Sequence, residues 1–163
     1  MSEDHDRVIF CGCIMKTSPD CVHKDEKLGT AIKKMIDGHI RFIPVLDGDG
    51  VLLGEVNAEN LVHNLLPKSM RLLNPSNRSN FLRETIQDFK ERLDAMLEDK
   101  VKQHLQTMPM VVETAPAAQA LAMICNTHRL IAVVDNEKDK KLKGIIDFTS
   151  ILSAIEKCKK VES

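Results

Sequence analysis

The sequence predicts an α+β protein built from two copies of one β-α-β-β-α unit. The main evidence is an internal repeat, because residues 35–47, MIDGHIRFIPVLD, reappear without a gap as residues 123–135, MICNTHRLIAVVD. Each copy also has apolar residues at helical spacing, followed by two strands that form a hairpin, and both features support the same fold. Since a repeated unit of this kind usually buries its apolar face against its twin, we expect the copies to stack on each other and any ligand to bind in the groove between them.

The first copy begins after an apolar stretch at residues 8–15 and a break at residues 17–20. Cys21-Val22-His23 is short and strand-like. A helix follows and ends at Gly38, because its apolar residues recur at helical spacing up to that point. The expected apolar stripe of this helix is Leu28, Ala31, Ile32, Met35 and Ile36.

A hairpin and a closing helix complete the first copy. Residues 42–46 and 51–56 are expected strands, joined by residues 47–50, a turn with two glycines that tolerate positive φ angles. The closing helix is expected over residues 57–66, with Asn57 as its cap and Pro67 as its end.

The second copy repeats this order. We expect a strand at residues 110–112, a helix at 117–125, a hairpin of residues 130–134 and 142–146, and a closing helix at 147–157. The turn of this hairpin is longer and highly charged, so we expect a solvated loop.

A loop at residues 74–77 and one long helix at residues 81–105 are expected between the copies. Apolar residues recur along this helix at steps of four and three and form a single stripe. Period alone does not decide whether the stripe folds back on the chain's own core or pairs with the same helix of a second chain. The stripe consists of Leu82, Ile86, Phe89, Leu93 and Met96.

The composition argues against several classes of protein. The 23 Lys and Arg against 24 Asp and Glu leave a formal charge of -1, which gives no electrostatic footprint for nucleic acid or an anionic membrane. No apolar run approaches the roughly 18 residues of a membrane span, and the acidic start differs from a secretion signal, so we expect a cytoplasmic protein. Five cysteines among apolar neighbours favour reduced thiols.

Neither metal binding nor catalysis is expected. His5, Cys11, Cys13, Cys21 and His23 are zinc-ligand types, but the Cys-x-Cys spacing is atypical and no second cluster follows. The other histidines lack the partners that nucleophilic or acid-base catalysis needs, and no Gly-rich phosphate loop occurs. We therefore expect that the protein is not an enzyme.

Two motifs in this order of elements resemble a tandem pair of cystathionine β-synthase-type (CBS) domains, the Bateman module. They are residues 43–50, IPVLDGDG, followed by GEVNAENL at 54–61, and residues 131–135, IAVVD, followed by GIIDFTSI at 144–151. The resemblance covers nearly all of residues 8–157. We expect a first repeat at residues 1–67, a linker with the long helix at 68–100, and a second repeat at 101–163.

The resemblance implies that the two repeats pack with pseudo-twofold symmetry. It also implies a regulatory module that binds an adenosine-containing ligand, such as AMP, ATP or S-adenosylmethionine, between the repeats. In ligand-binding members the closing helix usually starts with Thr or Ser, whose hydroxyl reaches a phosphate, and an Asp three residues later accepts hydrogen bonds from both ribose hydroxyls. This chain departs from the pattern at all four positions. It carries Asn57 and Asn60 in the first repeat, and Asp147 and Ser150 in the second.

These departures change the expected chemistry. An amide both donates and accepts, so Asn60 can still recognise ribose, but without the strength of a charged acceptor. Asp147 would repel a phosphate at a helix N-terminus that otherwise attracts one. A simpler interpretation, in which Asn57 and Asp147 only cap their helices, stays open.

Arg41 and Arg129 occupy the same repeat position just before the central strand. In the family, basic side chains near there can reach ligand phosphates, although both arginines could equally bridge to carboxylates. The resemblance also implies an apolar adenine slot, whose residues are otherwise ordinary strand core. The candidate ligand-binding residues are Thr17, Val22, Arg41, Ile43, Pro44, Asn57, Asn60, Val112, Arg129, Ala132, Asp147 and Ser150.

Two functions compete on this evidence. In the first, the protein is a homodimeric sensor in which an adenosyl ligand shifts the packing of the repeats and a downstream protein reads the change. In the second, the module dimerises or binds proteins through its helices and binds no nucleotide.

Overall fold

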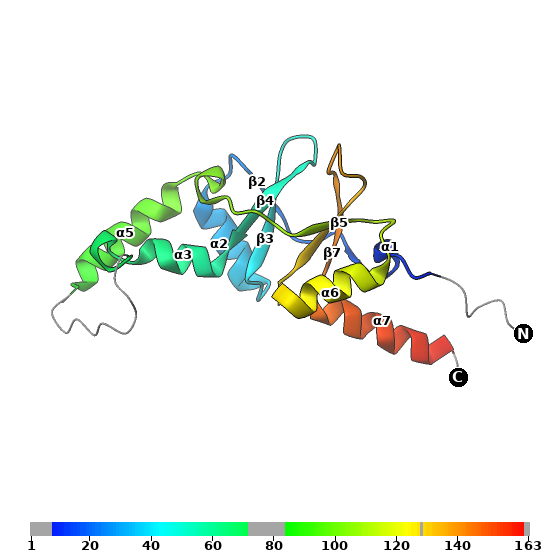
Figure 1. The fold of residues 1–163 in the computed structure, drawn as a ribbon. Helices are drawn as coiled ribbons and strands as arrows, with labels where there is room; N and C mark the ends of the chain where they lie inside the picture. The colour runs from blue at the N-terminus through cyan, green and yellow to red at the C-terminus, as the bar shows by residue number, and fades with distance from the viewer. Residues whose placement is uncertain (1–7, 72–83, 128, 162–163) are drawn as a thin grey trace, which may run out of the picture. The chain divides into compact units, whose positions relative to one another are not determined.

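A computed structural model describes residues 8–71, 84–127 and 129–161 of the chain. Within these residues the architecture is α+β, as predicted, with one small sheet and several helices in each of two compact units (Figure 1). We call them the N-unit, which holds the described parts of residues 21–45 and 54–106, and the C-unit, which holds those of residues 8–20, 46–53 and 107–161.

The first predicted copy is confirmed element by element. Its sheet has the strand order β2-β3-β4, and Gly38 ends the first helix as expected, at the C-cap position. Asn57 caps the closing helix. The elements are β2 (Val22–His23), α2 (Leu28–Asp37), β3 (Phe42–Leu46), β4 (Leu52–Asn57) and α3 (Ala58–Leu65), followed by a short helix α4 (Lys68–Arg71).

The second copy is also confirmed, and its sheet gains a strand that the sequence does not predict. The order is β1-β7-β6-β5, in which β5 and β6 are parallel while β6–β7 and β1–β7 are antiparallel. The last helix runs four residues past its predicted end at residue 157. The elements are α1 (Cys11–Ile14), β1 (Lys16–Thr17), β5 (Met110–Val112), α6 (Ala117–Thr127), β6 (Ile131–Val134), β7 (Leu142–Ile146) and α7 (Phe148–Val161).

The prediction of one long helix at residues 81–105 is wrong in its length. The helix α5 spans only Ile86–Glu98, and a 3-10 helix η1 follows at Val101–His104. Thr85 caps the start of α5, and Asp99 turns to an extended conformation, with φ -60° and ψ 156°, which ends it. Residues 74–77 and Leu82 lie outside the described residues.

The apolar stripe of α5 folds back on the chain's own core along its second half. Leu93 and Met96 pack with the core of the N-unit, and α5 lies alongside α3 and α2 (Figure 1). The first half of the stripe is exposed, since Ile86 is 88% accessible. Of the two alternatives left open by the sequence, folding back on the chain's own core therefore describes the C-terminal part of α5.

In each unit, the segment that precedes the other repeat forms backbone hydrogen bonds with the repeat of that unit. In the C-unit, Gly12 N donates to Glu113 O at 2.9 Å, and β1 pairs with β7. The equivalent contact in the N-unit joins Lys102 N to Lys24 O, also at 2.9 Å. Nearby, a hydrogen bond from Lys102 to the Asp25 carboxylate holds the pKa of Asp25 below its usual range.

Three apolar clusters form the cores. The N-unit core lies between its sheet and α2, α3 and α5, and includes Leu28, Ile43 and Val56. In the C-unit, one cluster lies on the helix side of the sheet and holds Cys11, whose burial raises the pKa of its thiol. Another covers the opposite face, where Leu46 and Leu52 from the tip of the β3–β4 hairpin meet Ala132 and Val134.

The capping box of α5 gives a pH prediction. Thr85 Oγ1 donates to Asp88 Oδ2 at 2.7 Å, and the Thr85 hydroxyl and amide hold the pKa of Asp88 below its usual range. A lowered pKa in the folded state means that the carboxylate stabilises the helix above its ordinary pKa and loses this effect as pH falls through the lowered value. Thr85→Ala is expected to move the pKa of Asp88 back towards its ordinary value, as measured by NMR titration. An unmoved pKa in the variant would contradict this.

Candidate functional site

The two asparagine candidates of the first repeat, Asn57 and Asn60, lie at the start of α3. Asn57 Oδ1 accepts from Asn60 N at 2.8 Å and thereby caps the helix, while Asn57 Nδ2 donates to Glu55 Oε1 at 3.1 Å. Glu59 adds a negative charge in the first turn, where the helix dipole favours it. The structure therefore supports the capping role of Asn57 and leaves Asn60 as the candidate for recognition.

Arg41 lies next to this helix start. Its backbone O accepts from Ala58 N at 2.9 Å, and its guanidinium forms an ion pair with Glu59 and lies 5.8 Å from the centre of the Phe42 ring. Both members of the ion pair are largely exposed. Because an exposed pair of this kind contributes little stability, a competing anion can replace Glu59 as the partner of Arg41 at small cost.

The expected apolar slot of the first repeat is not assembled on one face of the sheet. Val22 and Ile43 belong to the core on the helix side. Pro44 is buried as well, but successive residues of a strand point to opposite faces, so Pro44 faces away from those helices. Only Pro44 shares the face that carries Glu55 and Asn57 of β4.

Glu55 is a residue of this face that the sequence analysis missed. Its side chain is 0% accessible, and it lies one residue after Gly54, at the position that Ile145 holds in the second repeat. A buried carboxylate requires polar neighbours because its desolvation is costly, and Asn57 supplies one of them. The sequence repeat could have identified Glu55, because aligning the two copies places this glutamate at the position of an apolar residue, Ile145.

The candidate pair of the second repeat forms a reciprocal cap at the start of α7. Ser150 N donates to Asp147 Oδ1 at 2.7 Å, and Asp147 N donates to Ser150 Oγ at 2.9 Å. The Ser150 hydroxyl also donates to Asp147 O at 2.9 Å. This arrangement satisfies the local donors of the helix start, and it keeps the Asp147 carboxylate at the N-terminal end of α7.

The other candidates of the second repeat lie on three strands and a loop of the C-unit. Val112 and Ala132 pack in the same apolar cluster on the face away from the helices. Thr17 pairs with Gly144 in the strand that leads to Asp147, although it comes from the first part of the chain. Arg129 donates to Thr107 O at 3.4 Å.

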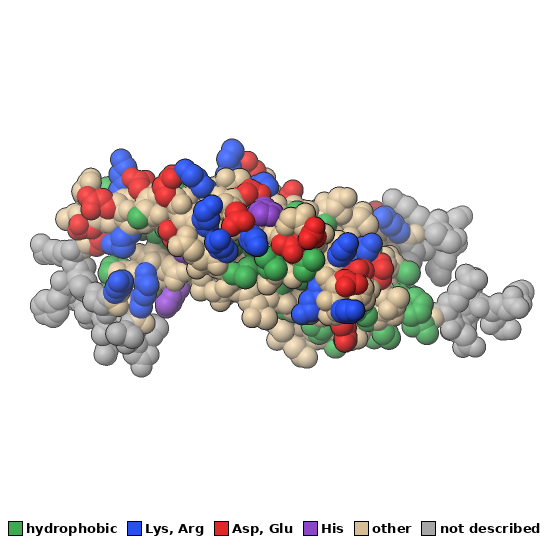
Figure 2. Space-filling view, turned by 90° about the horizontal axis from the view of Figure 1, so that it is seen from above, with side chains coloured by type: hydrophobic (Ala, Val, Ile, Leu, Met, Phe, Trp, Pro, Cys, Tyr) green, Lys and Arg blue, Asp and Glu red, His purple; other side chains and the backbone are tan. Residues whose placement is uncertain are grey.

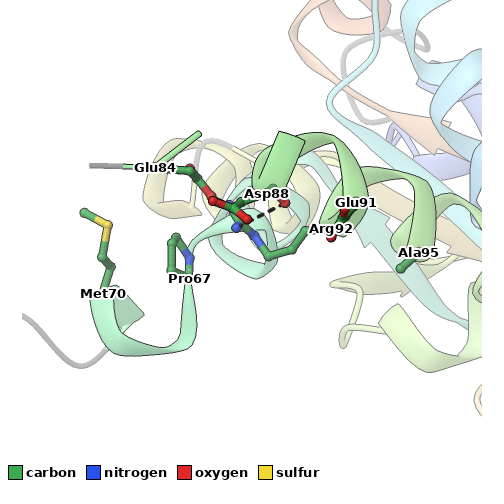
Figure 3. A pocket seen from close by; sticks show the side chains of 7 residues that line it. All are labelled: Pro67, Met70, Glu84, Asp88, Glu91, Arg92 and Ala95. Atoms are coloured by element: carbon green, nitrogen blue, oxygen red, sulfur yellow. Dashed lines mark hydrogen bonds and ion pairs between the residues drawn. The ribbon is translucent and has the colours of Figure 1, made fainter. Parts of the chain in front are cut away.

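Of three cavities lined by described residues, one includes a candidate residue. The first, of about 530 Å³, lies between α4 and the first turns of α5, where Arg92 forms an ion pair with Glu84 (Figure 3). A second, of about 450 Å³, is lined by Asn64, Arg92 and His104 among others. A third, of about 350 Å³ in the C-unit, is lined in part by the candidate residue Val112.

The described residues show neither a metal-binding cluster nor a membrane-spanning helix. No group of three or more His, Cys, Asp or Glu side chains in this part of the chain is placed to hold a metal ion, and His5 lies outside it. None of the described helices is long and apolar enough to cross a membrane. On the face seen in Figure 2, acidic and basic side chains are interspersed.

The chain was compared with known protein families and structures. The family described as CBS domain matches residues 11–67 and 101–157, and none of the curated proteins in the comparison matches the chain. A CBS domain-containing protein of unknown function from Bacillus anthracis is similar, with a TM-score of 0.68 and 23% identity over 91% of this chain and 94% of that one.

Two other similar structures contain adenosyl compounds. CBSX2, a CBS-pair protein from Arabidopsis thaliana, was solved in complex with AMP and has a TM-score of 0.64, with 17% identity over 92% of this chain and 98% of that one. The CBS domain pair of protein MJ0100, in complex with 5′-methylthioadenosine and S-adenosyl-L-methionine, has a TM-score of 0.59, with 14% identity over 93% and 99%. At these identities the likeness lies in the fold.

Proposed function

Because the chain belongs to the CBS domain family and carries two of these domains, we propose that it is a regulatory sensor of an adenosine-containing ligand. The candidate ligands are AMP, ATP and S-adenosylmethionine, and CBS pairs of similar fold hold AMP or S-adenosyl-L-methionine. The observation that supports the proposal most is the polar pair Asn57 and Asn60 at the start of α3. The module acts without catalysis, by a conformational change that a downstream protein reads.

The proposed domain organisation is a first repeat at residues 1–67, a linker with α5 at 68–100 and a second repeat at 101–163. In each repeat, the polar pair is proposed to meet the ribose and phosphate, and the arginine before the central strand to meet a phosphate. Since Asn57 and Asn60 are neutral while Asp147 is a carboxylate at the helix start, the first repeat is proposed to bind a phosphorylated ligand more tightly.

Thermal melting tests the proposal. A ligand that binds only the folded protein stabilises it by mass action, so ~1 mM ligand with a Kd of ~0.1 mM adds about 1.4 kcal/mol and raises the melting temperature by roughly 3–5 °C. AMP, ATP and S-adenosylmethionine are each added to the purified protein, with guanosine monophosphate as the control. A rise with at least one adenosyl compound and none with the control is expected. No rise with any of them would favour the alternative below.

Asp147→Thr is expected to strengthen AMP binding at the second repeat about fivefold, since a carboxylate at a helix N-terminus opposes an anion by about 1 kcal/mol. Thr keeps the capping function. The affinity is measured by calorimetry, with Asp94→Thr on the exposed side of α5 as the control for lost charge. Unchanged affinity in the Asp147 variant, or an equal gain in the control, would contradict the assignment.

The same proposal includes a homodimer formed through helices. Phe148, Leu152 and Ile155 form an exposed apolar stripe on α7, and Leu152 is 65% accessible. Val62 of α3 holds the equivalent position in the first repeat and is 63% accessible. An apolar position exposed in both repeats suits a second copy of the chain, because a twofold interface buries the same patch on each subunit.

Leu152→Glu is therefore expected to shift the protein from dimer to monomer, because a charge in a dry interface costs several kcal/mol. Sedimentation velocity measures the outcome, with Ile86→Glu on the exposed start of α5 as the matched control. If wild type is already a monomer at the concentrations tested, or if the variant remains dimeric, this interface is wrong.

An alternative function is a dimerisation or protein-interaction module that binds no nucleotide. The reciprocal cap of Asp147 and Ser150 favours it, because both side chains are already engaged with each other. The exposed half of the α5 stripe, Ile86 and Phe89, would then be the surface that a partner covers.

A further inference from the structure

A continuous chain of polar side chains runs along α3 from the candidate ligand residues to the end of α5. Asn57 Oδ1 accepts from Asn60 N, and Asn60 Oδ1 accepts from Asn64 Nδ2 at 3.1 Å. Asn64 Nδ2 also lies 3.3 Å from His104 Nδ1, and His104 Nε2 lies 2.8 Å from Asp99 Oδ2. We call Asn60, Asn64, His104 and Asp99 the α3 polar chain.

The donors and acceptors of the α3 polar chain fix the state of each member. The Asn64 amide has two N–H groups, of which one donates to Asn60 Oδ1 and the other to His104 Nδ1. His104 Nδ1 therefore accepts, and in a neutral ring the hydrogen lies on Nε2 and is donated to Asp99. In this state every hydrogen bond of the α3 polar chain joins one donor to one acceptor.

Burial makes this arrangement rigid at its centre. His104 is 8% accessible and sits in the short η1 helix, while Asn64 is half-buried on α3. A buried imidazole that loses a partner leaves an unsatisfied polar atom, which costs more than the hydrogen bond itself is worth. His104 thus fixes the orientation of the Asn64 side chain, and Asn64 fixes that of Asn60. Both His104 and Asn64 lie outside the candidate site.

The consequence for Asn60 is a defined orientation of its amide. Because its Oδ1 is turned towards Asn64 and accepts from it, the NH2 of Asn60 is turned the other way, and this group offers a ligand donors only. In the ligand-binding CBS proteins that the sequence resembles, an aspartate at this position accepts hydrogen bonds from the ribose hydroxyls. The polarity of the contact is therefore reversed in this chain.

We propose that Asn64 and His104 are positioning residues of the ligand site in the first repeat, and that they make Asn60 a hydrogen-bond donor to a ligand oxygen. This inference rests on the proposed function, because it assumes that an adenosyl ligand meets Asn60. It assigns the ligand an acceptor oxygen at the ribose position, and it adds two specificity-determining residues that do not touch the ligand.

Variants of His104 separate positioning from packing. His104→Gln keeps one acceptor and one donor, whereas His104→Phe keeps a planar ring but removes both nitrogens. Calorimetric titration uses whichever of AMP, ATP and S-adenosylmethionine binds wild type. His104→Gln is expected to bind within about twofold of wild type and His104→Phe about tenfold more weakly, the effect of one lost hydrogen bond. His63→Phe, at an exposed histidine of α3 outside the polar chain, is the control and is expected to bind as wild type does.

A second variant and a spectroscopic readout keep the test decisive if His104→Phe does not fold. Asn64→Ala is expected to weaken binding about tenfold as well, and the ligand is expected to shift the NMR signals of the Asn60 side-chain NH2 in wild type. Full affinity in His104→Phe or Asn64→Ala, or an unshifted Asn60 NH2, would overturn the positioning role and leave the proposed function standing. If none of the three compounds binds wild type, the proposed function fails and this inference fails with it.

Discussion

Gly54→Ala is expected to destabilise the fold by ~3 kcal/mol or more, a large share of the ~5–15 kcal/mol that stabilises a typical domain. A Cβ added at Gly54 would lie 2.3 Å from the backbone O of Gln106 and 3.0 Å from Leu105 Cδ1. The residue also has φ +155°, which L side chains rarely adopt. The absence of a side chain at Gly54 thus lets the backbone at Gln106 approach β4 closely, where Glu55 N donates to Gln106 O at 2.8 Å.

Two other glycines separate steric conflict from backbone strain. At Gly144, the equivalent position of the second repeat, a Cβ would lie 2.6 Å from the backbone O of Lys16. Gly50 has φ +80° but open space around it, so Gly50→Ala is expected to cost only about 1 kcal/mol. Urea denaturation should rank the losses as Gly54→Ala, then Gly144→Ala, then Gly50→Ala. Equal losses at Gly54 and Gly50 would show that the close approach does not matter.

Ile43→Ala and Ile131→Ala are each expected to cost about 3 kcal/mol of unfolding free energy. The two residues hold the same position in the two repeats, are fully buried, and lie in the helix-side core of their own unit. Removing three carbons there leaves a cavity that rigid neighbours fill only in part. Urea denaturation at constant m-value measures the loss.

Ile86→Ala provides the matched control, because the same side chain is exposed at the start of α5. Its loss is expected to stay within about 0.5 kcal/mol. A loss below about 1 kcal/mol at Ile43 would contradict its place in the core and revive its expected role as a ligand contact.

The repeat made the fold predictable from the sequence. Identical residues in identical order placed β3 and β6, and the glycine turn and the caps at Asn57 and Asp147 then fixed the neighbouring elements within a few residues. Local signals sufficed because these elements are short and each has its own start or stop residue.

Contacts between distant segments were not predictable. The apolar stripe of residues 81–105 has its last member at Met96, but no Gly or Pro follows it up to residue 105, so no local stop signal showed that α5 ends at Glu98. No local pattern marks Lys16 and Thr17 as a strand, because their partners are in β7. The same holds for the candidate site, where Asn57 and Asn60 were identified from the repeat but Asn64 and His104 emerged only from their hydrogen bonds. Glu55 differs, because its alignment with Ile145 in the repeat could have identified it.

Chemical-shift mapping with AMP, ATP or S-adenosylmethionine tests the ligand-sensing proposal most directly. Each compound is titrated into isotopically labelled protein, and the backbone amide signals are followed. The largest shifts are predicted at the starts of the closing helices, residues 57–60 first and 147–150 at higher concentration. Saturating concentrations that leave both regions unshifted, or shifts confined to other parts of the chain, would contradict it.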